Sequence, residues 1–312
     1  MQLYKSRGFS DFFQDTFTFL KQNGKHFFKH FFIINGVFIL ILMVFGYFFT
    51  KLYSEFLFGA LSNSANIIED YLNDNGVLFI LLGFLFLVIA LISATISYSY
   101  TPIYLQLYTK HRNTDFSTQD IINIYKQKIV NIFLFLLMSI VVGFLLLIPT
   151  GILIFLLVIT IVGILLLPLV IGAFALFFGC TLMEYLEGKK GLSESYGYAW
   201  KLMSSKFWAS VGSVGLFYFM SYIIQNVVSL IPYLFGMVSF FTTIEQQGQA
   251  DAEDVSSFMT FMMLLVFFLS FLVGTLLNNV VQLNQGIIFY SLKEENENVN
   301  TKSEIDLIGS GE

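Results

Sequence analysis

The three histidines are the first residues of this sequence that could do chemistry. His26 and His30 lie one helical turn apart, a spacing at which two imidazoles can share one metal ion. Neither a carboxylate nor a thiol joins them in the sequence, and lysines flank both, so we expect a surface pair near lipid headgroups. His111 lies in another basic segment, and the single cysteine, Cys180, lies in an apolar run. The sequence therefore predicts no metal site.

Glu184 and Glu187 are the best candidates for an acid–base pair. Two nearby carboxylates can divide the roles of general acid and general base. Lys189 and Lys190 follow directly in the sequence, which favours ordinary solvated charges at a membrane interface. The sequence shows no nucleophile motif, phosphate-binding loop or nucleic-acid-binding pattern. We therefore predict a protein that is not an enzyme, uses no cofactor and binds no nucleic acid.

Amide side chains gather in the last two apolar segments of the chain. Buried amides in hydrocarbon need hydrogen-bonding partners, so we expect them to face the interior of a helix bundle, with Asn278 near Gln225. Such a face can hold helices together, or it can line a path for a polar substrate; the sequence leaves both open. The candidate polar face comprises Gln225, Asn226, Asn278, Gln282 and Gln285.

The composition of the chain indicates that membrane-spanning helices position these residues. Of the 312 residues, 56% are hydrophobic and 12% are charged, against roughly 25% charged in a soluble domain. Apolar runs long enough to cross a bilayer recur along the chain. We predict an all-α integral membrane protein with six transmembrane helices. The spans are 31–49, 76–96, two in the uncharged stretch between Lys128 and Glu184, 207–241 and 257–292.

The turn between the third and fourth spans has two candidate positions. One is the Pro149–Gly151 segment and the other lies near Gly163, and the apolar signal continues through both. A hairpin in this stretch keeps the number of spans even. The turn itself is not fixed by the sequence.

The basic residues are divided unequally across this layout. Of the 16 Lys and Arg residues, all except Lys51 fall on one side of the membrane. Because short loops rich in Lys and Arg stay in the cytoplasm, both termini are predicted to be cytoplasmic. The predicted location is the bacterial inner membrane, with multiple passes.

The three basic segments share one pattern. Each begins at a serine suited to cap a helix, Ser10, Ser117 or Ser193, continues as an amphipathic helix and leads into a pair of spans. We therefore predict three repeats of a cytoplasmic amphipathic helix plus a transmembrane hairpin, with units at about 8–108, 114–187 and 191–293. Residues 1–293 form the transmembrane domain, and residues 294–312 form an acidic, disordered cytoplasmic tail.

The amphipathic helices carry the predicted lipid interface. Their apolar stripes must bury against headgroups or pack as elbows against the inner ends of the spans. We favour the lipid surface for the helix at Ser10 and the elbow for the helix at Ser193, with Trp200 buried at its centre. The candidate interface residues are Phe13, Phe17, Lys21, Lys25, Lys29 and Trp200.

Two stretches carry a resemblance to a known family. Residues 191–208, from Gly191 to Trp208, resemble the cytoplasmic helix of bacterial proteins built on the glycerophosphoryl diester phosphodiesterase membrane domain. Residues 285–294 are similar to the closing segment of that family, in which a tyrosine, here Tyr290, precedes a charged tail. The resemblance implies the six-span fold over most of 10–294. It implies no activity, because the catalytic domain of the fused members is expected to be missing here.

These observations favour a non-enzymatic membrane protein that organises or senses the inner membrane, or serves as an accessory of an envelope complex. Its expected partners are membrane lipids and a protein of such a complex. The alternative is a transporter or flippase for a lipid-like amphipathic substrate, which would use the amide face. The absence of Asp, Glu, Lys and Arg from the predicted spans argues against ion-coupled transport.

Overall fold

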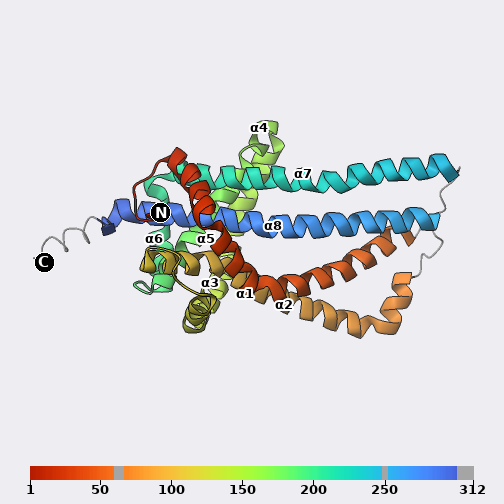
Figure 1. The fold of residues 1–312 in the computed structure, drawn as a ribbon, viewed down its shortest axis with the longest axis horizontal. Helices are drawn as coiled ribbons and strands as arrows, with labels where there is room; N and C mark the ends of the chain where they lie inside the picture. The colour runs from red at the N-terminus through yellow and green to blue at the C-terminus, as the bar shows by residue number, and fades with distance from the viewer. Residues whose placement is uncertain (60–66, 248–251, 301–312) are drawn as a thin grey trace, which may run out of the picture. The chain divides into compact units, whose positions relative to one another are not determined.

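The computed structural model describes residues 1–59, 67–247 and 252–300. Over these residues the chain is helical, without a strand (Figure 1). The helices are α1 (Phe9–Gly59), α2 (Ile67–His111), α3 (Thr118–Ile159), α4 (Ile161–Ile164), α5 (Leu167–Glu187), α6 (Leu192–Ser205), α7 (Phe207–Gln247) and α8 (Ala252–Glu297).

Six of these helices are long and apolar enough to cross a membrane: α1, α2, α3, α5, α7 and α8. Over the described residues, the prediction of an all-helical protein with six helices able to span a membrane is therefore confirmed, and this is the architecture of a multi-pass membrane protein. Several of the helices exceed the roughly 20 residues that a bilayer requires. Helix α1, for example, has 51 residues, because the basic N-terminal segment continues into the first span without a break.

The turn between the third and fourth spans lies at the second of its two candidate positions. Helix α3 runs through Pro149 and ends at Ile159, where Thr160 takes an extended conformation. Gly163 is needed in the short α4, because a Cβ atom there would lie 2.2 Å from the carbonyl oxygen of Leu157. Pro168 then stands in the first turn of α5, where its missing N–H is tolerated.

Helices α1, α3 and α6 begin with the same capping contact. In each, a carboxylate on the third helical residue accepts a hydrogen bond from the backbone N–H of the residue before the helix. This contact satisfies a backbone donor at the helix start and places negative charge at the positive end of the helix dipole. The pairs are Gly8 with Asp11 at 2.9 Å, Ser117 with Asp120 at 2.7 Å and Gly191 with Glu194 at 3.0 Å.

Only one of the three predicted capping serines caps a helix. Ser117 is the N-cap of α3, as predicted. For the other two helices the prediction was wrong, because Ser10 and Ser193 lie inside the first turns of α1 and α6. The residues before those helices are Gly8 and Gly191, which offer only their backbone.

The described chain forms two compact units. The first unit comprises Met1–Ile34, Thr95–Met220 and the chain from Asn278, and the second comprises Asn35–Ala94 and Ser221–Leu277. Helix α8 ends at Glu297, so the predicted tail from residue 294 starts inside a helix. Its remainder, residues 301–312, lies outside the described residues.

The C-terminal part of α8 is the central helix of the first unit. Every residue from 281 to 294 is buried. Gly286 has Leu105 of α2 on one side and Met183 of α5 on another, and a Cβ atom there would lie 2.1 Å from the Leu105 side chain. Helices α2 and α5 thus pack against α8, and its buried polar residues must find partners within the protein.

The second unit is held together by small residues and ring contacts. A Cβ atom at Gly46 of α1 would lie 2.0 Å from the ring of Phe267 of α8, so these helices touch closely. The Phe45 ring contacts the Phe86 ring of α2 at 5.5 Å. Helices α7 and α8 share a hydrogen bond of 2.8 Å between the hydroxyls of Ser229 and Ser270.

Candidate functional site

Asn284 is the polar centre of the first unit. Its side-chain amide is fully buried; it donates hydrogen bonds to the Phe12 carbonyl at 3.2 Å and the Thr16 hydroxyl at 3.0 Å, and its oxygen accepts one from the Ser213 hydroxyl at 3.3 Å. These partners belong to α1 and α7. One amide therefore ties three helices together in a place where an unpaired polar group would be costly.

Gln282 and Gln285, predicted to face inward, are both buried. The carboxamide of Gln285 lies against Gly179 of α5, where a Cβ atom would approach its oxygen to 2.4 Å, and it hydrogen-bonds Tyr218 of α7. The amide of Gln282 is buried with neither its oxygen nor its nitrogen bonded within the described chain. Asn278, in contrast, is exposed, so its predicted inward orientation was wrong; the adjacent Asn279 is buried instead.

The two amides of α7 lie in the second unit. Gln225 is partly buried, with its oxygen close to Gly274 of α8. Asn226 is exposed and donates to the carbonyl of Tyr222 in the preceding turn, so it does not face the bundle interior as predicted. The predicted meeting of Gln225 with the amides around Asn278 would join the two units, and it stays a prediction.

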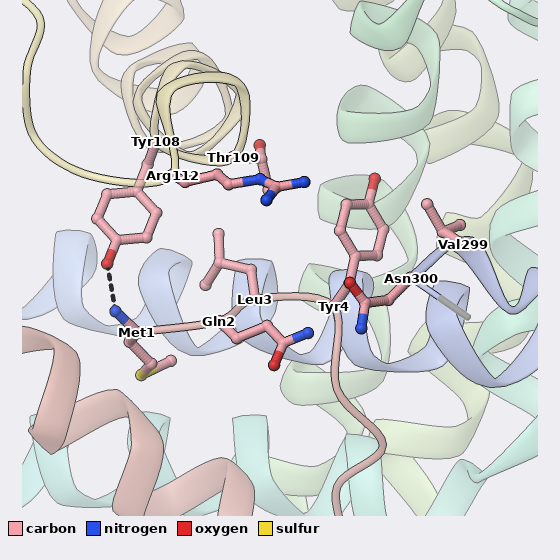
Figure 2. Close-up of a pocket in the computed structure, with 9 residues that line it drawn as sticks. All are labelled: Met1, Gln2, Leu3, Tyr4, Tyr108, Thr109, Arg112, Val299 and Asn300. Carbon is pink, nitrogen blue, oxygen red and sulfur yellow. Dashed lines mark hydrogen bonds between the residues drawn. The ribbon is translucent and has the colours of Figure 1, made fainter. Parts of the chain in front are cut away.

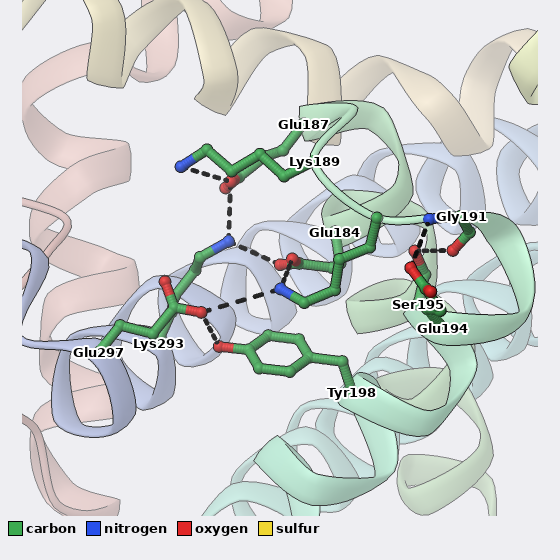
Figure 3. A network of polar contacts seen from close by, with 10 residues as sticks. Glu184, Glu187, Lys189, Gly191, Glu194, Ser195, Tyr198, Lys293 and Glu297 are labelled. Atoms are coloured by element: carbon green, nitrogen blue, oxygen red, sulfur yellow. Dashed lines mark hydrogen bonds and ion pairs between the residues drawn. The ribbon is translucent and has the colours of Figure 1, made fainter.

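A cluster of buried charges lies where α5, α6 and α8 meet (Figure 3). The ammonium group of Lys293 is 2.6 Å from a carboxylate oxygen of Glu184 and 2.7 Å from one of Glu187. The other oxygen of Glu184 is 2.5 Å from the ammonium of Lys190. The side chain of Glu184 is 0% exposed and that of Lys293 is 1% exposed. The prediction of ordinary solvated charges at Glu184 and Glu187 was therefore wrong.

Tyr198 and Glu297 complete this ionic cluster. The Lys190 ammonium lies 3.8 Å from the centre of the Tyr198 ring, and the Tyr198 hydroxyl donates a hydrogen bond to Glu297. Burial, and then the bond to Glu297, raise the pKa of Tyr198 well above its usual range, so the phenol stays protonated. Because each carboxylate faces an ammonium or hydroxyl group, the cluster works as a clamp that joins the ends of three helices.

Arg7 organises the segment that precedes α1. Its guanidinium is buried and donates to the backbone carbonyls of Gln2, Leu3 and Lys5, while its Nε lies 2.7 Å from a carboxylate oxygen of Asp15. A buried arginine of this kind holds the chain in one fixed path. In the sequence, Arg7 stands out only as one of the basic residues that predict the membrane orientation.

The histidine pair lies in a packed site between α1, α2 and the start of α3. The Nε2 atoms of His26 and His30 are 3.0 Å apart. His26 bonds the Tyr104 hydroxyl at 2.8 Å, His30 bonds the Thr118 hydroxyl at 2.5 Å, and His30 is only 6% exposed. The expected surface pair is therefore a buried network. Among the described residues, no group of three His, Cys, Asp or Glu side chains is placed to hold a metal ion.

The predicted aromatic stripe on α1 packs against protein. The Phe13 and Phe17 rings lie 5.4 and 5.7 Å from the ring of Phe217 on α7, so this helix is an elbow more than a free lipid surface. The fully buried face of α1 is a neighbouring face of the helix, which carries Phe12 and Phe19. Phe13 is only partly buried and Phe17 stays 42% exposed, so lipid contact by the rest of this stripe stays a prediction.

The three lysines of α1 form an exposed basic face. Lys21, Lys25 and Lys29 are all exposed and follow one another at four-residue intervals, which places them on one side of the helix. Within the described chain none of them is ion-paired. The α1 lysine face is thus available to a negatively charged surface.

Trp200 does not lie at the centre of a buried contact. It is 59% exposed, whereas Tyr196 and Met203 of the same helix are buried, so the expectation of a buried Trp200 at the centre of this helix was wrong. Its place at a lipid interface stays a prediction. The Tyr196 hydroxyl shares a hydrogen bond of 2.8 Å with Ser139 of α3. Helix α6 is therefore an elbow, but Tyr196 anchors it and Trp200 is left on the surface.

Comparison with known proteins adds no relative. No family model, no curated protein and no solved structure matches this chain. The resemblance to the membrane domain of glycerophosphoryl diester phosphodiesterases stays a prediction. The class of the protein, a multi-pass helical membrane protein, comes from its six apolar helices alone.

Proposed function

We propose that this chain is a non-enzymatic protein of the bacterial inner membrane that senses or organises anionic lipid through the α1 lysine face. The observation that carries the proposal is the row of Lys21, Lys25 and Lys29, exposed along the helix that continues into the first span. Phe32 and Ile33, which follow, are exposed apolar residues suited to the acyl region. Cations next to an apolar helical face are the arrangement that lies at a headgroup layer.

The buried part of the first unit supports this function by holding α1 in place. Asn284 bonds the α1 backbone at Phe12, and Arg7 pairs with Asp15 of the same helix. The lysine face is therefore presented by a fixed helix. A fixed row of cations loses less conformational freedom on meeting headgroups than a flexible tail would.

The orientation and the repeat belong to the same proposal. With all basic residues except Lys51 in segments on one side, the positive-inside rule places the α1 lysine face and both termini in the cytoplasm. The shared carboxylate cap of α1, α3 and α6 supports three repeated units of cytoplasmic helix plus hairpin.

Exposed Trp200 and Trp208 are suited to contact lipid or a protein of an envelope complex. The family resemblance is part of this proposal and names no activity.

The test compares two triple variants that remove the same charge. In vesicles, spin-labelled lipids give the association of the protein with phosphatidylglycerol relative to phosphatidylcholine. The triple variant K21Q/K25Q/K29Q should lose most of this preference, since each cation near an anionic surface contributes about 1 kcal/mol. The matched control K5Q/K110Q/K201Q removes three lysines that are equally exposed but scattered over other segments, and it should keep the preference.

Equal losses in the two triples would mean that net charge, rather than this face, sets the lipid preference, and the proposal would fail. Circular dichroism and size-exclusion profiles of both variants should match the parent. All six lysines lie on the surface, so their neutralisation leaves the packed core intact.

A second function, transport or flipping of a lipid-like amphipathic molecule, is favoured by one observation. The buried amide of Gln282 has no partner within the described chain, which is unusual at such depth unless water or a substrate group completes it. Scrambling of a fluorescent phospholipid in proteoliposomes, lost in Gln282→Leu but kept in the exposed control Asn226→Leu, would favour transport over sensing.

A further inference from the structure

A pocket of about 560 Å³ opens in the first unit (Figure 2), and its lining includes none of the α1 lysines. Three segments form it: the chain before α1, the end of α2, and the two residues after Asn298. Its size lies within the range of pockets that bind small molecules. The lining residues are Met1, Gln2, Leu3, Tyr4, Tyr108, Thr109, Arg112, Val299 and Asn300.

Among the residues that the structure describes, the lining carries positive charge and no carboxylate. The Arg112 guanidinium extends across the hollow toward the Tyr4 ring (Figure 2), and within the described chain it has no ion pair or hydrogen bond. The amino group of Met1 donates to the hydroxyl of Tyr108, in the last turn of α2, at 2.6 Å. The pocket is therefore rich in donors that lack an acceptor, above all the five N–H groups of one arginine.

The two carboxylates of the neighbouring hollow are already engaged. Glu294 and Glu295 line a neighbouring hollow. Glu294 accepts a hydrogen bond of 2.8 Å from the backbone of Asn300, and Glu295 pairs with Lys206 and with the Ser6 hydroxyl. Neither carboxylate is therefore available to neutralise Arg112.

Arg112 is held at the pocket by an unusual backbone conformation. It directly follows α2 with a φ of +58°, in the left-handed region. Glycine is the usual residue at this position after a helix, because a side chain is strained there. A long cationic side chain at such a position, turned toward an open pocket, is more consistent with a binding role than with a simple helix end.

The walls of the pocket are fixed before any ligand enters. Leu3 is buried, and the Arg7 guanidinium donates hydrogen bonds to the backbone carbonyls of Gln2 and Leu3. The Tyr4 ring packs edge-on against Tyr290 of the central helix, with ring centres 5.1 Å apart. A preformed cationic pocket with an aromatic wall binds an anion without first ordering the chain.

We propose that this pocket binds a phosphate group through Arg112, carried by a small phosphorylated molecule or by a phospholipid headgroup. A guanidinium matches two phosphate oxygens in a fork-like contact, which a lysine cannot reproduce. Tyr4 and Leu3 supply an apolar surface for the group that bears the phosphate. The site is separate from the α1 lysine face, and it goes beyond lipid sensing by that face.

The test uses the full-length protein in neutral nanodiscs with inorganic phosphate as the probe. Phosphate, compared with chloride at equal ionic strength, should raise the melting temperature of the parent protein, because a ligand that binds only the folded state stabilises it. Arg112→Gln should weaken phosphate binding by about tenfold or more, the effect of losing a charged hydrogen-bonding partner. Lys110→Gln removes the same charge from the exposed last turn of α2 and should bind phosphate like the parent.

A second arm separates the two sources of the phosphate. The ligand is a headgroup if two results are found together. Inorganic phosphate has no effect, and nanodiscs with about 30% phosphatidylglycerol stabilise the parent and Lys110→Gln but not Arg112→Gln. If neither probe distinguishes Arg112→Gln from Lys110→Gln, the proposal is overturned. The variant K21Q/K25Q/K29Q should respond to phosphate like the parent, so failure of the pocket and failure of the lysine face give different results.

Discussion

Lys293 is the charged residue that the central helix carries into the interior of the first unit. Its ammonium group has two carboxylate partners, Glu184 and Glu187, both more than 100 residues away in the sequence. Moving such charges out of water costs several kcal/mol per ion, which their mutual attraction and hydrogen bonds must offset. The stability of the site therefore depends on the complete set of partners.

Replacing Lys293 alone should be strongly destabilising. Lys293→Met keeps the bulk of the side chain but leaves Glu184 buried with only Lys190 beside it, and we expect a loss of about 3 to 5 kcal/mol in the free energy of unfolding. Reversible denaturation in detergent measures it. Lys189→Gln is the control, since that side chain is 70% exposed and 4.0 Å from Glu187; it should change stability by less than about 1 kcal/mol.

Adding Glu184→Gln to Lys293→Met should recover part of the loss, because the double variant no longer buries an underpaired carboxylate. If the single and double variants are equally unstable, packing rather than charge explains the effect. Equal stability of Lys293→Met and Lys189→Gln would contradict the assignment of Lys293 to a buried clamp.

The sequence allowed a prediction of which residue types would matter here, but not of their environment. Glu184 and Glu187 stand out as a candidate pair, yet lysines next to them in the sequence fit a solvated helix end as well as a buried cluster. What decides between them is Lys293, which no local pattern links to Glu184. The same holds for His26 and His30, whose partners Tyr104 and Thr118 come from distant segments.

At the scale of elements, helical periodicity predicted that α1 and α6 are amphipathic, and each packs one face against another helix. It failed to choose the buried face. Helix α1 begins with two neighbouring rows of phenylalanine, so the stripe through Phe13 and the stripe through Phe12 fit the period equally well. Tertiary packing places Phe12 in the core and Phe13 against Phe217.

Helix α6 offers a direct test of its anchoring residue. Tyr196 is 8% exposed and bonds Ser139, whereas Trp200, one turn further, is 59% exposed. Tyr196→Ala should cost about 3 kcal/mol or more through the cavity it opens and the bond it removes. Trp200→Ala should cost less than about 1 kcal/mol, although tryptophan is the larger side chain. Thermal unfolding in detergent ranks the two.

The reverse order of stability would place Trp200 in a buried contact and restore the sequence-based expectation for this helix. Tyr196→Phe separates the two contributions of Tyr196. It keeps the ring and loses only the bond to Ser139, so its cost should lie near 1 kcal/mol.

At the scale of the whole molecule, the number of spans was predictable because it rests on a strong local signal. An uncharged apolar run of about 20 residues has few alternatives to a membrane helix. The sequence predicted that a turn separates the third and fourth spans, but not which residues form it, since Pro149 and Gly163 can both break a helix. The choice of Gly163 depends on a close approach to Leu157 that no composition reveals.

The membrane topology is the prediction that concerns the molecule as a whole. A reporter that is active only in the periplasm should be active when fused near Asn63 or Gln249, and inactive near Asn113, Gly188 or Asn298. The reason is the division of the 16 basic residues, of which all but Lys51 fall on the side assigned to the cytoplasm. Gly188 is the decisive position, because it directly follows α5 and precedes Lys189 and Lys190. Activity there would mean that every segment after Gly188 has the opposite orientation. The α1 lysine face and the ionic cluster would then lie on different sides of the membrane. A cytoplasm-active reporter at the same five sites should give the complementary pattern, which guards against fusions that are simply degraded.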